Sequence, residues 1–112
     1  MSLNAQILRR KVLDDRAYLS LIKLDLDNKD RECFGFNFSF NLVLEFGDII
    51  YEAVPKEANY YFSEQDFFDL YSLIKTKDDY IRTISVVKKV RNLDDVKTLR
   101  SIGFKEGILG KF

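Results

Sequence analysis

The sequence predicts an α+β domain, in which one face of an antiparallel meander of four to five strands is covered by two helices. Apolar side chains occupy every even position from Phe34 to Phe46, a period of two that is typical of a strand with one buried face. Residues 64–75 instead have apolar side chains at helical spacing, preceded by a capping residue, Ser63. We therefore expect this helix to lie across the apolar face of the long strand.

Length and composition indicate one folded domain that spans residues 1–112. The chain is 46% hydrophobic and 32% charged, and its eighteen basic residues equal its eighteen acidic residues. Zero net charge argues against nucleic acid as the main partner, because phosphate binding generally needs a basic field. Residues 33–44, the longest uncharged stretch, are too short and too polar to cross a bilayer, and the N-terminus does not resemble a signal peptide. We expect a cytoplasmic protein without a membrane partner.

The N-terminal segment, residues 6–26, has two interpretations. It could form two strands around a tight turn at residues 14–15. Alternatively, residues 3–16 could form a helix, since Leu8 and Val12 have helical spacing. The sequence leaves both interpretations open.

The next segments are predicted to be strands separated by a polar turn. Residues 17–26 alternate as a strand does, and the change of phase at residues 21–22 predicts a β-bulge. Residues 27–31 are polar and charged, which predicts a turn. The strand from Phe34 to Phe46 would span ~43 Å at ~3.3 Å per residue, so we expect it to bend, with Gly35 as the candidate position.

A type II′ turn is predicted at residues 47–48, because glycine at its first position suits the twist of antiparallel strands. The strand that follows, residues 49–54, should end at Pro55, which cannot donate to the ladder. The expected pairs on the apolar side are Phe46 with Ile49, Leu44 with Tyr51 and Leu42 with Ala53.

The helix at residues 64–75 has the clearest local signals. Asp66 would complete a capping box with Ser63, and Phe62 would contact Phe67 as a hydrophobic staple. The expected buried stripe comprises Phe67, Leu70, Tyr71 and Ile74.

The C-terminal third is predicted to contain a strand and a short helix. Residues 80–90 are rich in β-branched side chains, which favours a strand after a turn. Asn92 or Asp94 could cap a helix that runs to about residue 101, and Gly103 would end it in the left-handed conformation. The remaining glycine-containing segment predicts a tail or a short strand.

The chain contains no histidine, which excludes Ser-His-Asp and Cys-His nucleophile systems and histidine-rich metal sites. Cys33 is the single cysteine, and we expect it to be a small buried hydrophobe. Residues 25–36 lack the ligand spacing of a calcium loop, and residues 107–111 lack that of a phosphate loop. We expect no cofactor, no metal and no enzyme activity.

Two basic clusters are candidates for anion binding. On strands, Arg9 and Lys11 would share one face, as would Lys89 and Arg91. Adjacent strands of this kind could form a strip that binds RNA or another anion, although lysine at a sheet edge is also a common guard against pairing between edges, which we favour. The clusters comprise Arg9, Arg10 and Lys11, and Lys88, Lys89 and Arg91.

The aromatic residues exceed what so small a core can hold, which predicts a partner surface. The stripe from Phe34 to Phe46 is expected to be core, because it lacks the convergent polar groups of a ligand pocket. Exposed aromatic residues are typical of protein interfaces. The expected surface aromatic residues are Tyr60, Tyr61, Phe68, Phe104 and Phe112.

The sequence therefore favours a small non-enzymatic module that binds another protein and that could form a homodimer. An immunity protein, an inhibitor, an antitoxin or a mobile-element accessory protein would fit. The alternative is a weak RNA- or anion-binding domain that uses the two basic clusters.

Overall fold

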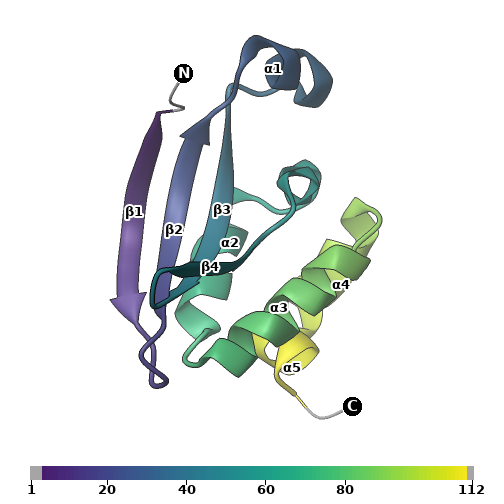
Figure 1. The fold of residues 1–112 in the computed structure, drawn as a ribbon. Helices are drawn as coiled ribbons and strands as arrows, with labels where there is room; N and C mark the ends of the chain where they lie inside the picture. The colour runs from purple at the N-terminus through teal and green to yellow at the C-terminus, as the bar shows by residue number, and fades with distance from the viewer. Residues whose placement is uncertain (1–3, 111–112) are drawn as a thin grey trace.

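The computed structural model of the chain describes residues 4–110, except the side chains of Tyr51 and Glu52. The described residues form one antiparallel sheet in the order β1-β2-β3-β4, five α-helices and one 3-10 helix, which confirms the α+β class and the meander (Figure 1). The strands are β1 (Ala5–Val12), β2 (Tyr18–Asp25), β3 (Phe38–Phe46) and β4 (Ile49–Ala53). The helices are α1 (Asn28–Phe34), η1 (Lys56–Tyr60), α2 (Glu64–Leu73), α3 (Lys77–Lys89), α4 (Leu93–Ile102) and α5 (Phe104–Ile108).

Helix α2 lies on one face of the sheet, and α3, α4 and α5 lie to one side of the sheet (Figure 1). Helix α2 packs on β2 and β3, and α3 reaches the sheet where the Tyr80 hydroxyl donates to the Leu42 carbonyl at 2.7 Å. The extents of 41 × 36 × 18 Å match this arrangement, because packed layers lie ~10 Å apart. We call the helix-covered side of the sheet the inner face and the opposite side the open face.

The core lies between the inner face and the helices. Phe40 on β3 lies 6.0 Å from Phe67 on α2, measured between ring centroids. Other fully buried side chains of this layer are Leu19, Leu21, Leu42, Leu44, Leu70, Tyr80 and Ile84. Among the described residues no helix is long and apolar enough to cross a membrane.

The N-terminal segment forms two strands, so the helical alternative for residues 3–16 is wrong over its described part. The turn at residues 14–15 is confirmed. A bulge occurs at the predicted level of the ladder, but the extra residue is Leu8 in β1, opposite residues 21–22 of β2. The change of phase within β2 has another cause: Leu21 is on the inner face and Ile22 on the open face, and both are apolar.

The predicted turn at residues 27–31 is wrong, because this segment begins helix α1. The Asp27 carboxylate caps the helix by accepting from the Asp30 backbone N–H at 2.8 Å. Gly35 ends the helix with φ of 75° and ψ of 14°, a left-handed conformation that glycine adopts without steric cost. The long strand therefore starts at Phe38 instead of Phe34, and Gly35 ends a helix instead of bending a strand.

The turn between β3 and β4 has the expected glycine, with φ of 63° at Gly47. Phe46 pairs with Ile49 as predicted. The other two predicted pairs are wrong, because β4 contains an extra residue that shifts the register. In the structure Leu44 pairs with Glu52, and Ala53 pairs with Val43 instead of Leu42.

Helix α2 has the predicted start. The Asp66 backbone N–H donates to the Ser63 hydroxyl at 3.2 Å, and the Ser63 N–H donates to the Asp66 carboxylate at 2.8 Å. The staple is also present, with the Phe62 and Phe67 ring centroids 6.2 Å apart. Of the predicted stripe, Tyr71 alone is half-buried and the other three residues are fully buried.

The predicted strand at residues 80–90 is wrong, because it forms most of helix α3. Thr76 caps this helix and shares a capping box with Asp79. β-branched residues can form a helix when tertiary packing favours it, because the helix and strand propensities of single residues are weak. The buried side chains follow helical spacing at Tyr80, Thr83, Ile84 and Val87.

Helix α4 is confirmed, with Asn92 as its cap. Gly103 follows it with φ of 85° and ψ of 133°, which is not the predicted left-handed helical conformation. The prediction of a tail or a short strand after Gly103 is wrong, since residues 104–108 form helix α5.

Candidate functional site

The predicted surface aromatic residues occupy different environments. Tyr60 is exposed, at 46%, whereas Tyr61 and Phe68 are half-buried against the core. Phe104 is buried, with its ring centroid 6.4 Å from that of Phe62, so its interpretation as a surface residue is wrong. Phe112 lies outside the described residues.

Tyr60 belongs to a cluster that the sequence interpretation missed, formed by Phe34, Phe36, Tyr60 and Tyr61. The centroid of the Tyr60 ring lies 4.8 Å from Phe34, 6.3 Å from Phe36 and 6.1 Å from Tyr61. These distances are in the range of favourable aromatic pairs. We call this group the aromatic cluster.

The ends of two short helices bring the rings of the aromatic cluster together. Phe34 is the last residue of α1, and Gly35 turns the chain so that the Phe36 ring comes within 5.5 Å of the Phe34 ring. Tyr60 is the last residue of η1, which follows Pro55. The Asp27 cap and Gly35 were the signals in the sequence that could have identified α1, but the regular alternation of phenylalanines pointed to a strand.

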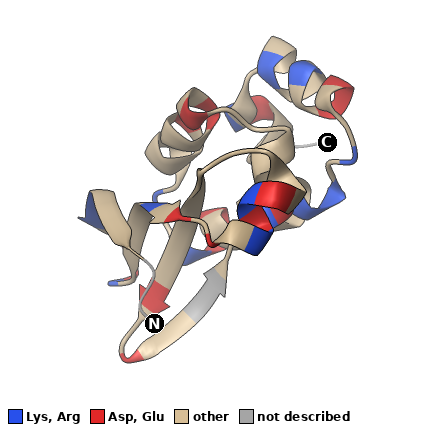
Figure 2. Cartoon of the chain, turned by 90° about the horizontal axis from the view of Figure 1, so that it is seen from above, with Lys and Arg blue, Asp and Glu red and all other residues tan. Residues whose placement is uncertain are grey.

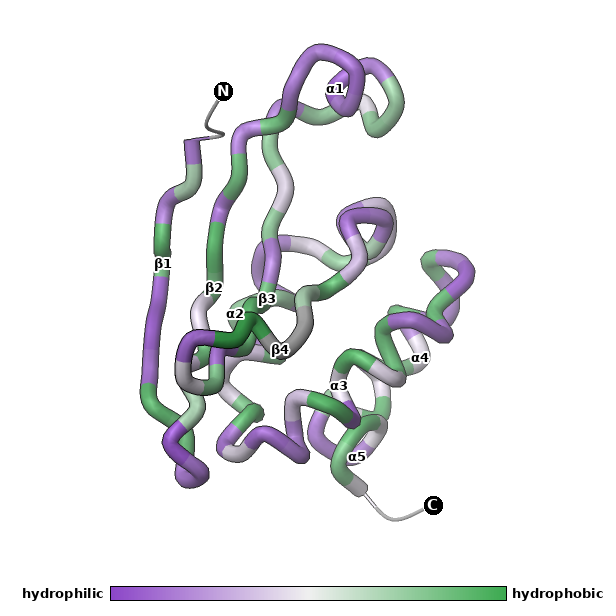
Figure 3. Tube along the Cα trace, in the orientation of Figure 1, coloured by the Kyte–Doolittle hydropathy of each residue, from purple (hydrophilic) through white to green (hydrophobic). Residues whose placement is uncertain are grey.

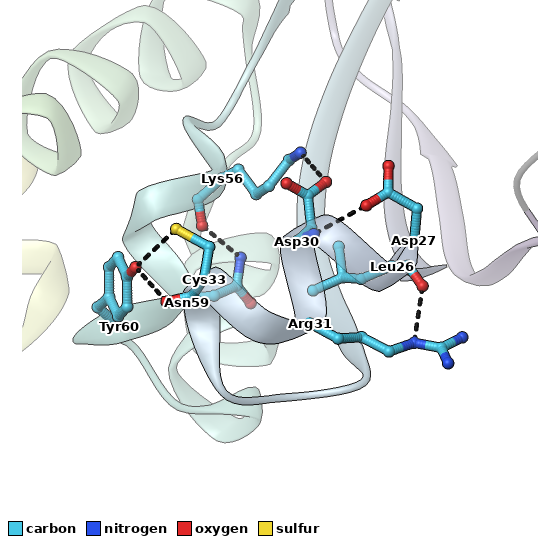
Figure 4. Close-up of polar contacts among 8 residues, drawn as sticks. All are labelled: Leu26, Asp27, Asp30, Arg31, Cys33, Lys56, Asn59 and Tyr60. Atoms are coloured by element: carbon cyan, nitrogen blue, oxygen red, sulfur yellow. Dashed lines mark hydrogen bonds and ion pairs between the residues drawn. The ribbon is translucent and has the colours of Figure 1, made fainter.

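Polar contacts join α1 to η1 beside the aromatic cluster (Figure 4). The Lys56 ammonium forms an ion pair with the Asp30 carboxylate at 2.6 Å. The Tyr60 hydroxyl donates to the Cys33 carbonyl at 3.3 Å and lies 3.9 Å from the Cys33 sulfur. These contacts hold the two short helices together, so the rings they carry have a fixed arrangement.

Asn59 attaches η1 to the sheet. Its side-chain oxygen accepts from the Phe40 N–H at 2.8 Å, and its amide nitrogen donates to the Phe40 carbonyl at 3.0 Å. Asn59 thus pairs with the backbone N–H and carbonyl of Phe40, at an edge of β3 that β4 does not reach, as a neighbouring strand would. The aromatic cluster is anchored to the rigid part of the fold.

Cys33 is exposed on α1, so its interpretation as a buried hydrophobe is wrong. Desolvation, followed by the hydrogen bond with Cys33, raises the pKa of the Tyr60 phenol. Tyr60 is therefore neutral at physiological pH and can donate a hydrogen bond.

Phe38 also departs from the expected core. It lies on the inner face outside the part that α2 covers, and its side chain is exposed. The Lys23 ammonium lies 4.0 Å from the centroid of the Phe38 ring, a distance typical of cation–π contacts.

In the first basic cluster, Arg9 and Lys11 share a face as predicted, and both contact α2. The Arg9 guanidinium lies 5.4 Å from the centroid of Phe68. The Lys11 ammonium lies 4.4 Å from that of Tyr71 and donates to the Tyr71 carbonyl at 2.7 Å. Burial, and then the charge of Lys75, lowers the pKa of Lys11. These side chains have structural contacts within the chain.

The second basic cluster lies elsewhere. Lys88 and Lys89 are in the last turn of α3 and Arg91 follows that helix, so these residues are not on a strand. The end of α3 and strand β1 lie at opposite sides of the molecule (Figure 1). Basic and acidic residues are also interspersed along the chain (Figure 2). The expected single strip of Arg9, Lys11 and the second cluster does not form.

A shallow hollow of about 710 Å³ lies between α2 and the junction of α4 and α5. Its central ion pair joins Asp66 to Arg100 through two hydrogen bonds, one of them from Arg100 Nε to Asp66 Oδ1 at 2.9 Å. Gln65 donates to Asp69 at 3.0 Å in the same wall. Because these polar groups bond to one another, the hollow presents little to a ligand.

Comparison with protein-family models, with curated proteins and with solved structures finds no match to this chain.

Proposed function

We propose that this chain is a small non-enzymatic interaction module and that it binds another protein through the aromatic cluster. The observation that carries this proposal is the gathering of three rings around Tyr60, which is 46% exposed, at the junction of α1 and η1. Tyrosine and other aromatic residues supply much of the binding energy at protein interfaces.

The fixed arrangement of the rings supports this proposal. Binding is weakened by the entropy lost when interface side chains become ordered. Here the Lys56–Asp30 ion pair and the Asn59 hydrogen bonds already order η1 and α1. A partner would meet a preformed apolar surface with a charged rim, which suits a protein segment that inserts an apolar or aromatic side chain.

Classes of protein that act by binding alone fit this proposal. They include immunity proteins, inhibitors, antitoxins and mobile-element accessory proteins. The RNA- or anion-binding alternative has less support, since Arg9 and Lys11 contact α2 and lie far from Lys88 and Lys89.

Partner capture with matched aromatic variants tests the proposal. The immobilised chain is incubated with a lysate of the source organism, and captured proteins are quantified for wild type, Tyr60→Ala and Phe46→Ala. Phe46 is a close control because it is an aromatic residue, is 45% exposed and lies at the end of β3, outside the aromatic cluster. We expect Tyr60→Ala to reduce capture of the partner about tenfold or more, and Phe46→Ala to retain it.

Circular dichroism of each variant controls for folding. Equal capture by wild type and Tyr60→Ala, or no captured protein with wild type, would contradict the proposal. Phe36→Ala serves as a second variant and should behave as Tyr60→Ala does, because the Phe36 ring lies in the same cluster.

A further inference from the structure

The open face of the sheet carries a second apolar surface, separate from the aromatic cluster. Four of its side chains are substantially exposed: Ile7 at 53%, Val12 at 59%, Tyr18 at 41% and Ile50 at 67%. Three more, Ile22, Leu24 and Val43, are half-buried. We call these seven residues the open-face patch. Figure 3 shows hydrophobic residues recurring along β1 and β2.

The register of the sheet places these residues on one face. Directly paired residues in antiparallel strands have their side chains on the same side. Val12 pairs with Tyr18, Tyr18 with Glu45, and Glu45 with Ile50, which makes one row across all four strands. Ile7 pairs with Ile22 in a row further along.

No helix of residues 4–110 packs along this patch. Helix α2 contacts β2 and β3 from the inner face, η1 contacts β3 where Asn59 bonds to the backbone of Phe40, and α5 contacts α2, α3 and α4. Helix α1 lies beyond the ends of β2 and β3 (Figure 1). The 18 Å thickness of the molecule leaves room for one helix layer only.

The charge on the open face is balanced. Its charged side chains within the described part of the chain are Arg10 and Glu45, which lie 4.0 Å apart. The Arg10 guanidinium also lies 4.7 Å from the centroid of the Tyr18 ring. The whole chain likewise has a net charge of zero, so two copies meet without long-range repulsion.

We propose that a second copy of this chain packs on the open-face patch, sheet against sheet, to form a homodimer. The surface is large enough for a weak, reversible dimer. Strands lie ~4.8 Å apart and rise ~3.3 Å per residue, so three strands of about eight residues and the shorter β4 have a footprint of about 450 Å². Two such faces bury about 900 Å² in total before side-chain relief is counted, which is the size of a weak specific interface.

The charges on the open face suit a second copy. A two-fold axis brings the same surface of both copies together, and an axis that passes midway between Arg10 and Glu45 would place each of them opposite the other residue of the partner copy. Pairing through the edge of β1 is disfavoured, because Arg9, Arg10 and Lys11 place three positive charges along that edge strand. The dimer therefore forms through the face of the sheet and leaves the aromatic cluster accessible.

Sedimentation equilibrium over a range of concentrations tests this proposal with matched isoleucine variants. Ile7 is 53% exposed on the open face, and Ile102 is 47% exposed on α4. We expect the wild-type chain to dimerise and Ile7→Glu to raise the dissociation constant about tenfold or more, because the carboxylate would be buried without a partner. Ile102→Glu should dimerise as wild type does.

A charge exchange gives an independent measurement. Arg10→Glu places two carboxylates on each open face and should also weaken the dimer, and adding Glu45→Arg should restore it. A wild-type chain that stays monomeric at hundreds of micromolar would overturn the proposal. So would a dimer unaffected by Ile7→Glu, or one weakened equally by Ile102→Glu. The proposed function stands or falls separately, since Tyr60→Ala leaves the open face unchanged.

Discussion

The two faces of the central strands differ both in what covers them and in their composition. On the inner face, Leu19 and Leu42 are fully buried beneath the helices. On the open face, Ile22 and Leu24 of the same strand pair remain partly accessible. Strand β2 has apolar residues on both faces, whereas the open face of β3 is polar at Ser39, Asn41 and Glu45, and α2 covers the inner face alone. This comparison teaches that apolar alternation marks surfaces to be buried without saying what buries them.

The largest expected effect is a difference in stability between two leucines on these faces. Leu42→Ala should lower the free energy of unfolding by about 3 kcal/mol, because it leaves a cavity beneath α2 and α3. Leu24→Ala should lower it by about 1 kcal/mol or less, since its side chain is already half-exposed in the single chain. Urea denaturation at low protein concentration, where association contributes little, measures both values. Equal losses would contradict the assignment of the faces.

The ion pair between Asp66 and Arg100 should contribute more to the free energy of unfolding than the exposed pair between Arg10 and Glu45. Desolvation of Asp66 opposes its ionisation, but hydrogen bonds from Arg100 and Ser63 outweigh it and hold the pKa of Asp66 below its usual value. Asp66→Asn should therefore lower the free energy of unfolding by about 2 kcal/mol at neutral pH. Glu45→Gln should lower it by about 0.5 kcal/mol or less, because the pair with Arg10 is exposed.

The pH dependence sharpens this second comparison. Because the pKa of Asp66 is depressed in the folded chain, its contribution is present above the unfolded value of ~3.9 and is lost as pH falls through the folded value. The stability difference between wild type and Asp66→Asn should thus shrink as the solution is acidified below about pH 4. A difference that does not change with pH would show that the Asp66 carboxylate charge contributes little.

The parts of the fold that were predicted correctly depend on interactions between residues that are close in the sequence. Helix α2 begins with a capping box at Ser63 and Asp66, and both contacts form within four residues. Helix α3 was missed, because its β-branched residues favour strands locally and its packing through Tyr80 and Ile84 depends on distant partners. Tertiary burial decided its conformation.

The candidate site was predicted in part for the same reason. Tyr60 was identified from the surplus of aromatic residues, but its neighbours Phe34 and Phe36 were assigned to a buried strand. Their position depends on the Asp27 cap and on Gly35, which interrupt the alternating pattern. The exposure of Ile7 and Ile22 on one face followed from strand pairing, which no local pattern specifies.

Methyl NMR spectra of isoleucine-labelled protein, recorded from low to high micromolar concentration, test the difference between the two faces most directly. The open face carries Ile7, Ile22 and Ile50, whereas Ile81 and Ile102 lie on α3 and α4. We predict that the methyl signals of the first three isoleucines shift with concentration as the second copy covers them, and that those of Ile81 and Ile102 do not. Concentration-independent spectra, or shifts confined to Ile81 and Ile102, would contradict the account.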